Sequence, residues 1–418
     1  MSRVDTEPAD DGHGMTDAAP AQSVESTPIV IPPPLREALI LHLFMGREAG
    51  GITSALGQWL PAQREAGWRH LAIQLGPGDA GRELAKFGVD TVVANNGRGL
   101  RTLDRFRKLH RDLAAIAPAI VHTHNPLGQS YASIARRRVE FKLVRTVHAD
   151  ASLEMKHALS LPARIFWSTM TRRAMKRTDA VICIHEHVRA SLDPGVRERA
   201  SVSPNGLDPG PIERSTASIP EAFRAWLGSD EVPLILGVGR FVAIKRWPWV
   251  IRAFSASNAS SRGARLALLG QGPAKRELEA LLAELDLEDR VRIEPWAPDI
   301  APYLKRAAFT VIASRSETGP LTLLEAMAAS TPSIATRVGL TADTIVDGVT
   351  GRLIDHPSSE SLSSGDITRL ANTIDSMLAD PVALRSMGTA ARERLRGRFD
   401  HRATAAARAV IYNALLGD

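Results

Sequence analysis

Two glutamates, Glu317 and Glu325, are separated by seven residues and lie on either side of an expected strand-to-helix junction. The apolar run 309–313 predicts a buried strand, and the helical spacing of apolar residues after Pro320 predicts a helix. Pro320 suits the first helical position, because its missing N–H would have no partner within the helix, and Gly319 frees the turn before it. We therefore expect Glu317 in the loop and Glu325 on the second helical turn.

A helix N-terminus beside two carboxylates predicts a particular kind of ligand. Free backbone N–H groups attract anions, and carboxylates accept hydrogen bonds from hydroxyl groups. The segment 314–331 could thus bind a sugar phosphate, with the phosphate on backbone donors and the hydroxyls on Glu317 and Glu325. The alternative is that Glu325 is only a solvated residue on the helix surface.

A pair of cations, Arg240 and Lys245, follows another expected strand in the segment GVGRFVAIKRW. Open parallel sheets bind ligands at the carboxyl ends of their strands, and an Arg fork with a Lys point charge can neutralise a diphosphate. Alone the pair is weak support, because loop cations are mostly solvated. GVGRFV and GQGPAK carry only the first two glycines of a dinucleotide fingerprint, so hydride transfer with a nicotinamide cofactor is disfavoured.

Short apolar runs alternate with amphipathic helical segments along most of the chain. This alternation predicts an α/β fold with doubly wound parallel sheets. The apolar runs stop at a polar connection, 205–220, and begin again after Glu231. We expect a disordered tail at 1–34, a first Rossmann-like domain at 35–212, a second at 213–401, and a final helix at about 402–418 that could pack on either domain.

Length and hydropathy restrict the class of protein. The chain has 418 residues, and a single core stops growing at roughly 250–300 residues, so two cores are expected. Its apolar runs are far shorter than the roughly 20 residues that cross a bilayer, and its acidic N-terminus does not resemble a signal peptide. We predict a cytoplasmic protein. The single cysteine, Cys183, lies in the apolar run AVICI and is expected to be buried rather than nucleophilic.

Basic residues are concentrated in the first half of the chain. Residues 35–210 carry 26 basic and 16 acidic side chains, although the net charge of the whole chain is only +6. An anionic membrane surface is one expected partner, and a merely solvated basic face is the other interpretation. The stretch 161–177 resembles an interfacial helix or a core-packed helix with a basic outer face. We expect no nucleic acid partner, because aromatic residues do not interleave with the basic ones.

Five segments, taken in order, resemble the retaining glycosyltransferases of family 4. Their fold, GT-B, has two Rossmann-like domains that face each other across a cleft. The resemblance runs from about Leu41 to Tyr412, and its most specific part is ETGPLTLLEAMA, which is similar to the family's paired-glutamate motif. The supporting segments are GRFVAIK, LLGQGP, VSPNGLD and TRVGLTADTIVDGVTGRLI.

The resemblance implies roles for residues of the second domain. Arg240 and Lys245 would hold the nucleotide diphosphate, and backbone N–H groups at the start of the helix would complete the phosphate site. Glu325 would bind ribose hydroxyls, and Glu317 would contact hydroxyls of the donor sugar near the reacting carbon. The implied donor-binding residues of this domain are Arg240, Lys245, Gly319, Pro320, Leu321, Thr322 and Glu325.

In the first domain the resemblance implies a glycine loop and a histidine. Gly50 and Gly51 would let the backbone approach the donor phosphate, or they simply begin the next helix. His124, in HTHNP, matches a histidine that reaches the sugar across the cleft. We expect His122 to be a core residue, whereas His148 could lie in the core or in the cleft.

Several positions depart from the family's pattern. Thr318 and Gly319 stand where glycine and an aromatic or aliphatic residue are more frequent. Ser330 and Arg246 occupy common glycine positions, and Leu340 replaces the second glycine of a pair. None of these changes removes a charged residue that is expected to bind the donor. They therefore bear on which donor is bound more than on whether the protein is active.

The implied function is transfer of a sugar from a nucleotide-sugar donor to a hydroxyl of a saccharide or lipid-linked acceptor, with the anomeric configuration retained. The catalytic residues would be His124, Glu317, Arg240 and Lys245. No cofactor is implied, and no metal is expected, because no Asp-x-Asp pair follows an apolar strand. We expect a role in the synthesis of cell-surface polysaccharide, lipopolysaccharide or glycolipid at the inner face of the plasma membrane. The alternatives are a GT-B-like sugar-nucleotide epimerase and a catalytically silent nucleotide-sugar-binding protein.

Overall fold

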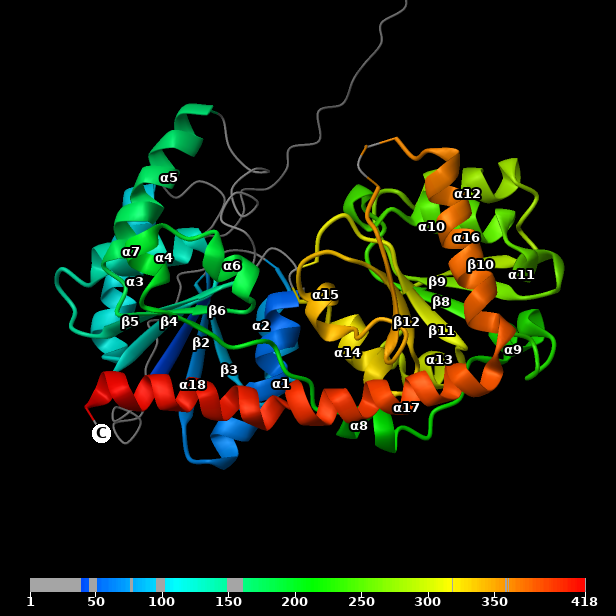
Figure 1. Cartoon of the computed structure of the whole chain (residues 1–418). Coiled ribbons are helices and arrows are strands. Elements are labelled where there is room, and N and C mark those ends of the chain that lie inside the picture. Colours follow the sequence, from blue (N-terminus) through cyan, green and yellow to red (C-terminus); the bar gives the residue numbers. More distant parts are fainter. Residues whose placement is uncertain are drawn as a thin grey trace, which may run out of the picture.

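The computed structural model of the chain describes residues 39–44, 51–75, 78–94, 102–148, 161–317, 319–357, 359 and 361–417. The expected tail at 1–34, together with Gly50 and Thr318, lies outside these residues. Figure 1 shows two lobes side by side, each with a sheet between helices, and a helical segment that runs beneath both lobes.

The first lobe contains a seven-stranded, entirely parallel sheet of order β3-β2-β1-β4-β5-β6-β7. Its strands are β1 (Leu39–Phe44), β2 (Arg69–Leu75), β3 (Asp90–Ala94), β4 (Ile120–Thr123), β5 (Lys142–Val147), β6 (Ala180–Cys183) and β7 (Ala200–Val202). Each coincides with an apolar run, as expected for strands covered on both faces. The parallel sheet expected for the first Rossmann-like domain is confirmed, and Cys183 is buried as predicted.

Helices cover both faces of this sheet. They are α1 (Gly51–Glu65), α2 (Ala80–Ala85), α3 (Thr102–Ile116), α4 (Pro126–Ala135), α5 (Leu161–Lys176), α6 (Glu186–Ala190), α7 (Pro194–Arg197) and, from the end of the chain, α18 (His401–Leu416). α3 and α4 share an apolar core with the odd-numbered residues of β1. α1 and α18 pack on the opposite face, where Trp59 and Tyr412 are buried.

The second lobe contains a six-stranded parallel sheet of order β10-β9-β8-β11-β12-β13. Its strands are β8 (Leu234–Val238), β9 (Arg265–Leu269), β10 (Val291–Glu294), β11 (Phe309–Ile312), β12 (Ser333–Thr336) and β13 (Gly351–Ile354). All six were predicted from apolar runs, so the doubling of the architecture is confirmed.

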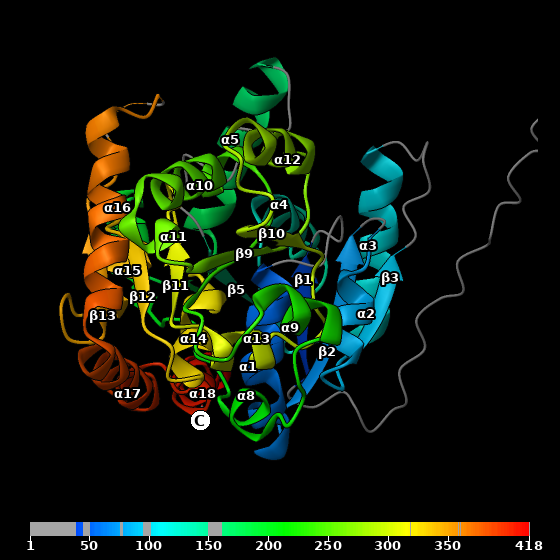
Figure 2. The same cartoon turned by 90° about the vertical axis from the view of Figure 1, so that its right-hand side faces the viewer.

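The helices of the second lobe also lie on both sides of its sheet (Figure 2). They are α8 (Gly210–Arg214), α9 (Glu221–Leu227), the 3-10 turn η2 (Ala243–Lys245), α10 (Trp247–Ala256), α11 (Asn258–Ser261), α12 (Lys275–Glu284), α13 (Ala301–Arg306), α14 (Leu321–Ala328), α15 (Leu340–Thr344), α16 (Ser364–Ala379) and α17 (Pro381–Arg398). One core joins α10, α12 and α16. The other joins α13, α14 and α17 on the opposite face.

The chain crosses between the lobes twice, and the two crossings lie side by side. Leu207 N–H donates to the Phe399 carbonyl at 2.9 Å, next to a parallel bridge between Leu207 and Asp400. Asp400 caps α18. The helix then packs on the first lobe, where Gln63 Nε2 donates to the Ala405 carbonyl at 2.8 Å. The chain thus returns to the first lobe after completing the second.

The strand orders indicate where a ligand would bind. In both sheets the order reverses once, between β1 and β4 in the first lobe and between β8 and β11 in the second. Loops leave in opposite directions at such a point and open a crevice at the carboxyl ends of the strands. Within the parts of the chain that the structure describes, no helix is both long enough and apolar enough to cross a bilayer.

Candidate functional site

Lys245 and Glu317 meet at the reversal point of the second sheet. Lys245 Nζ donates to Glu317 Oε1 at 2.5 Å, and Ser314 Oγ donates to the same oxygen at 2.5 Å. Lys245 ends the turn after β8, and Glu317 lies in the loop after β11. Because β8 and β11 are neighbours, the fold brings together two residues that are 72 positions apart.

This ion pair is largely shielded from water, since the Lys245 side chain is 22% exposed and that of Glu317 is 9% exposed. Such a pair interacts more strongly than one on an open surface. A diphosphate is a natural competitor for the lysine, because its oxygens can replace the carboxylate. Glu317 would then be released to accept hydrogen bonds from hydroxyl groups.

Backbone contacts hold both loops of the site. Arg315 N–H donates to the Ile244 carbonyl at 2.8 Å, and Leu340 N–H donates to the Glu317 carbonyl at 3.2 Å. Gly339 has a φ of 49°, and a Cβ added there would lie 1.8 Å from the Glu317 carbonyl oxygen. Glycine is therefore required at 339. The first glycine of the family's pair is present, whereas Leu340 stands at the second.

Glu325 lies on α14, which follows directly. The helix begins at Leu321, one residue later than predicted, because Pro320 has an extended ψ of 102° and serves as the N-cap. Leu321 and Thr322 form the first turn, where backbone N–H groups have no partner within the helix. Glu325 is half-buried, and desolvation raises the pKa of its carboxyl to about 7. Partners that donate hydrogen bonds would favour its charged form.

Arg240 lies in the loop that leaves β8. Its side chain is exposed, and its carbonyl accepts a hydrogen bond from Trp247 Nε1 at 2.9 Å. The indole contact fixes the backbone of the loop. The Arg240 side chain therefore leaves a fixed backbone position, five residues before Lys245.

The lobes meet beside this site. His185 Nε2 lies 2.6 Å from Asp343 Oδ2, and a Cβ added at Gly319 would lie 2.9 Å from Asn205 Nδ2. His185 and Asn205 follow β6 and β7, whereas Gly319 and Asp343 follow β11 and β12. The loops at the carboxyl ends of the two sheets thus face each other, with Gly319 at their contact.

The predicted first-lobe residues follow the neighbouring strands β1 and β4. Gly51 begins α1 and is exposed, and among the residues that the structure describes no atom lies within 4 Å of a Cβ added there. His124 follows β4 and is only 1% exposed. Its Nε2 lies 3.0 Å from His42 Nδ1, and its Nδ1 lies 3.2 Å from His148 Nε2. Other histidines therefore hold His124.

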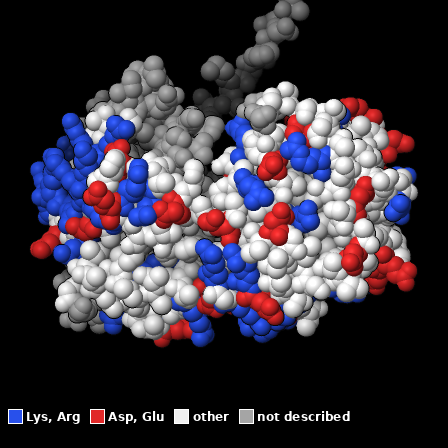
Figure 3. Space-filling view, viewed as in Figure 1, with Lys and Arg blue, Asp and Glu red and all other residues white. Residues whose placement is uncertain are grey.

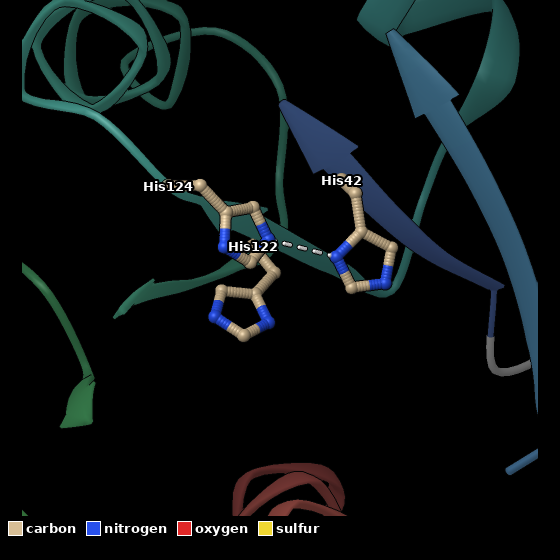
Figure 4. A group of neighbouring side chains, drawn as sticks. All are labelled: His42, His122 and His124. Atoms are coloured by element: carbon tan, nitrogen blue, oxygen red, sulfur yellow. Dashed lines mark hydrogen bonds between the residues drawn. The ribbon is translucent and has the colours of Figure 1, made fainter. Parts of the chain in front are cut away.

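Sequence reasoning missed this buried histidine group, part of which is shown in Figure 4. His42 Nε2 also lies 3.0 Å from His70 Nδ1. Burial lowers the pKa of His42, His122 and His124 well below 6.5, and nearby positive charges lower it further. Burial also lowers the pKa of His70 and His148 to about 3. The available signal was the pair of histidines two apart in IVHTH, since such residues share a face of a strand.

Comparison with protein families gives two matches that together account for most of the chain. Residues 49–210 match "Glycosyltransferase Family 4", and residues 218–394 match "Glycosyl transferases group 1". The chain belongs to the group 1 glycosyltransferases of family 4. The family inferred from the sequence motifs is thus confirmed.

Curated glycosyltransferase relatives align with part of the chain. The N-acetyl-alpha-D-glucosaminyl L-malate synthase of Bacillus anthracis is 31% identical over 190 residues, which are 46% of this chain and 48% of that protein. The D-inositol 3-phosphate glycosyltransferase of Frankia alni is 29% identical over 281 residues, 63% of this chain and 66% of that protein. The chain thus spans about half to two thirds of the length of these relatives.

Solved structures share the glycosyltransferase fold over nearly the whole chain. Anabaena HepE, in complex with UDP-glucose, has a TM-score of 0.74 at 18% identity, covering 90% of this chain and 99% of HepE. Sucrose-phosphate synthase from Thermosynechococcus elongatus has a TM-score of 0.70 at 24% identity, covering 91% and 99%. At these identities the likeness shows the fold, and the predicted GT-B architecture is confirmed.

Two departures from the family's glycine pattern share one backbone explanation. Arg246 has a φ of 53° and Ser330 a φ of 57°, in the left-handed region that glycine adopts without strain. Arg246 is 8% exposed and donates from Nη2 to the Ser359 carbonyl at 3.1 Å. The backbone therefore keeps the shape that a glycine would favour, although both residues carry side chains.

Proposed function

We propose that this glycosyltransferase moves a sugar from a nucleotide-sugar donor to an acceptor hydroxyl, with the anomeric configuration retained. The contact between Lys245 and Glu317 carries the proposal, because it puts a cation for a diphosphate next to a carboxylate for a sugar. In a nucleotide sugar the diphosphate and the anomeric carbon are likewise neighbours, joined by one oxygen. One ligand can therefore engage both side chains.

The rest of the donor would extend along α14. Backbone N–H groups of its first turn would bind phosphate oxygens, and Glu325, one turn further, would accept hydrogen bonds from the ribose hydroxyls. Arg240 would add a second cation to the diphosphate. Solved structures of the same fold that hold UDP and UDP-glucose support a donor of this class.

In the proposed reaction the bond between the anomeric carbon and the diphosphate oxygen breaks while the acceptor oxygen attacks from the same face. The departing diphosphate oxygen takes the acceptor's proton, so the reaction uses no protein nucleophile. Lys245 and Arg240 stabilise the negative charge that grows on the diphosphate, and the proposal includes neither a metal ion nor another cofactor. Glu317 positions the sugar. His124 could reach the sugar only by leaving its contacts with other histidines.

A donor screen followed by a transfer assay tests the proposal. Purified protein is mixed with a panel of nucleotide sugars, and a specific donor is expected to raise the melting temperature. With that donor, Lys245→Ala should lower transfer by about 100- to 1,000-fold, as removal of one stabilising donor does elsewhere. Lys275→Ala is the matched control, because Lys275 pairs with Glu279 on the exposed face of α12. Near-native turnover by folded K245A would contradict the assignment.

Product analysis separates the two alternative functions. A sugar-nucleotide epimerase would convert the donor without an acceptor. A catalytically silent binding protein would show the thermal shift but neither transfer nor hydrolysis. Either result would refute a transferase, whereas a product that contains both the sugar and the acceptor would support it.

We further propose that the acceptor is a saccharide or lipid-linked saccharide of cell-surface polysaccharide, lipopolysaccharide or glycolipid synthesis, reached at an anionic membrane surface. Figure 3 shows Lys and Arg gathered on the outer side of the first lobe, in contrast to the mixed charges of the second. Each such residue contributes about 1 kcal/mol near an anionic membrane. The exposed basic residues in and after α4 and α5 are Arg137, Arg138, Lys142, Arg172, Arg173, Lys176 and Arg177.

Liposome flotation tests the membrane contact. At low salt, liposomes with anionic lipid should retain the protein, and high salt should release it. The double variant Arg173→Glu, Lys176→Glu should lose retention. The same reversal at the exposed residues Lys275 and Arg276 of the second lobe should not. Equal retention by neutral and anionic liposomes would remove the basis for this proposal.

A further inference from the structure

Five histidines lie on the face of the first sheet that α1 and α18 cover, or at its carboxyl edge. Ring-nitrogen contacts of 3.0, 3.0 and 3.2 Å join His70, His42, His124 and His148 in a row. His122 packs against His124 with ring centroids 4.4 Å apart. Sheet faces under helices are normally filled by apolar side chains, so a buried group of imidazoles calls for a specific explanation.

The arrangement of three of these rings matches a metal site. Ligand nitrogens of His42, His122 and His124 all lie within 4.8 Å of one another, and Figure 4 shows the rings gathered between β1 and the end of β4. A tetrahedral Zn²⁺ with Zn–N distances of about 2.0–2.1 Å would hold nitrogens about 3.3 Å apart and ring centroids about 5 Å apart. The nitrogens of His42 and His124 are 3.0 Å apart, and the centroids are separated by 4.4, 5.3 and 5.3 Å. His42 and His124 thus nearly have the required spacing, and a ring nitrogen of His122, within 4.8 Å of theirs, must turn toward them.

The remote ring nitrogens of His42 and His124 already have partners. His42 Nε2 lies 3.0 Å from His70 Nδ1, and His124 Nδ1 lies 3.2 Å from His148 Nε2. A metal-bound histidine usually donates its other ring N–H to an acceptor, which fixes its tautomer and orientation. His70 and His148 are placed to be those acceptors.

His122, which is a core residue as predicted, has a partner at each ring nitrogen. Its Nδ1 lies 2.6 Å from Tyr412 Oη, and its Nε2 lies 2.7 Å from Thr146 Oγ1. One of these contacts can remain while the other nitrogen turns to an ion. All three rings are thus supported by a second layer of polar groups.

We propose that His42, His122 and His124 bind one transition-metal ion, with Zn²⁺ the ion that fits best. Three imidazoles without a carboxylate suit Zn²⁺, Cu²⁺ or Ni²⁺, whereas Mg²⁺ and Ca²⁺ require oxygen ligands. The buried cations Arg145 and Arg408 interact electrostatically with His122 and oppose further positive charge, so only an ion that bonds strongly to nitrogen can enter. The ion would tie β1 to β4 where the strand order reverses.

Metal titration of the full-length protein tests this inference without an activity assay. Protein freed of metal by a chelator is titrated with Zn²⁺ against a chromophoric indicator, and separately with Co²⁺, whose visible absorption reports coordination number. One Zn²⁺ per chain is expected, with the intense bands of four-coordinate Co²⁺. His42→Gln and His124→Gln keep polar side chains of similar size and should abolish binding. His70→Gln, which changes only a supporting residue, should weaken it by roughly 10- to 100-fold.

His187→Gln is the matched control, because His187 is exposed and lies outside the group. It should bind Zn²⁺ as the unmodified protein does. Absence of stoichiometric Zn²⁺ binding, unchanged affinity in H42Q, or loss of binding in H187Q would each overturn the proposal. If H42Q and H124Q fail to fold, as judged by circular dichroism, X-ray absorption of the Zn²⁺-loaded unmodified protein decides the matter: three imidazole ligands support the site, and any other ligand set refutes it.

Discussion

The two lobes have the same strand order around their reversal points but carry different chemistry there. In the second lobe Lys245, Glu317 and Glu325 are charged or readily charged groups that follow β8 and β11. In the first lobe the corresponding region contains His42, His122 and His124, which are buried and neutral. A shared topology therefore determines where a site lies and leaves open what the site does.

The difference follows from where each side chain leaves the backbone. Lys245 and Glu317 belong to loops beyond the ends of β8 and β11, where each charge has the other as its partner although both side chains are largely shielded from water. His42 and His122 lie within β1 and β4 and point toward the face covered by α18, where desolvation prevents charging. The proposed donor site of the second lobe thus consists of charged groups, whereas the matching region of the first lobe holds groups that remain neutral.

The largest predicted effect tests whether α18 belongs energetically to the first lobe. Tyr412 is fully buried there and contacts His122 at 2.6 Å. Tyr412→Ala should destabilise this lobe by about 3–5 kcal/mol, as loss of a buried aromatic side chain does. Tyr412→Phe, which removes only the hydroxyl, should cost about 1–3 kcal/mol. Hydrogen exchange measured by mass spectrometry should show faster exchange in β1 and β4.

Val410→Ala is the control for this prediction, because Val410 is on the same helix and 68% exposed. It should change stability by less than about 0.5 kcal/mol. Faster exchange confined to β8 and β11 in Y412A would show instead that α18 supports the second lobe.

The next effect concerns the backbone of the second-lobe site. Gly339→Ala should displace the Glu317 carbonyl, because the new Cβ would lie 1.8 Å from it. We expect a loss of about 1–3 kcal/mol together with a sharp fall in sugar transfer. Gly348→Ala is the matched control. Gly348 also has a positive φ, 76°, but within the described parts of the chain no atom lies within 4 Å of an added Cβ. Equal activity of the two variants would show that Gly339 does not support the site.

A smaller effect concerns the charge of Glu325. Its folded pKa is raised to about 7 from 4.5. Between these values the folded protein holds a proton that the unfolded chain has lost, so stability falls as the pH rises from 4.5 to about 7. Ribose hydroxyls favour the ionised form, and donor binding should therefore release a proton. Affinity for a nucleotide sugar, whose phosphates remain ionised, should fall by up to about tenfold per pH unit below 7.

Calorimetry in buffers of different ionisation enthalpy measures this proton release. Glu325→Gln, which cannot ionise, should bind more weakly with little pH dependence in this range. An unchanged pH profile in E325Q would show that another group titrates. It would also weaken the contrast between a chargeable second-lobe site and a neutral first-lobe core.

The smallest effect should be stabilising. Ser330 has a φ of 57°, and replacement by glycine relieves left-handed strain of about 1–2 kcal/mol, partly offset by the greater flexibility of the unfolded chain. Ser330→Gly should therefore raise stability by about 0.5–1 kcal/mol in urea titrations without changing transfer. Ser330→Ala, which keeps a Cβ in the same conformation, should show no gain. A gain in stability in both variants would show that the serine hydroxyl, rather than the backbone conformation, is the source of the strain.

Much of the architecture could be predicted from the sequence because buried parallel strands appear as uninterrupted apolar runs. Runs such as LILHLF and FTVIA mark β1 and β11 to within a residue or two. The lobe on which the last helix packs could not be predicted. An amphipathic pattern shows that one face of a helix is buried, but it does not show which part of the protein covers that face. The contact of Tyr412 with His122 settles that question only in three dimensions.

The candidate site was accessible to sequence reasoning in part. Lys245, Glu317 and Glu325 were named because charged residues after apolar runs, beside a helix start, have a recognisable local pattern. The direct contact of Lys245 with Glu317 joins residues 72 positions apart, and it depends on β8 and β11 being neighbours. The grouping of His42, His122 and His124 into one set of potential metal ligands was missed. Each strand segment contains only one or two histidines, and such a number by itself indicates ordinary core residues.

The sequence by itself determined the elements, the two-lobed family fold and the charged residues of the second lobe, since these depend on local periodicity and motif spacing. Only the tertiary structure decided which strands are adjacent, which loops meet and which helix covers each face. Those choices determine whether a side chain is solvated or buried. Desolvation therefore leaves five histidines neutral in one lobe, whereas in the other a shielded lysine and glutamate keep their charges as partners of each other.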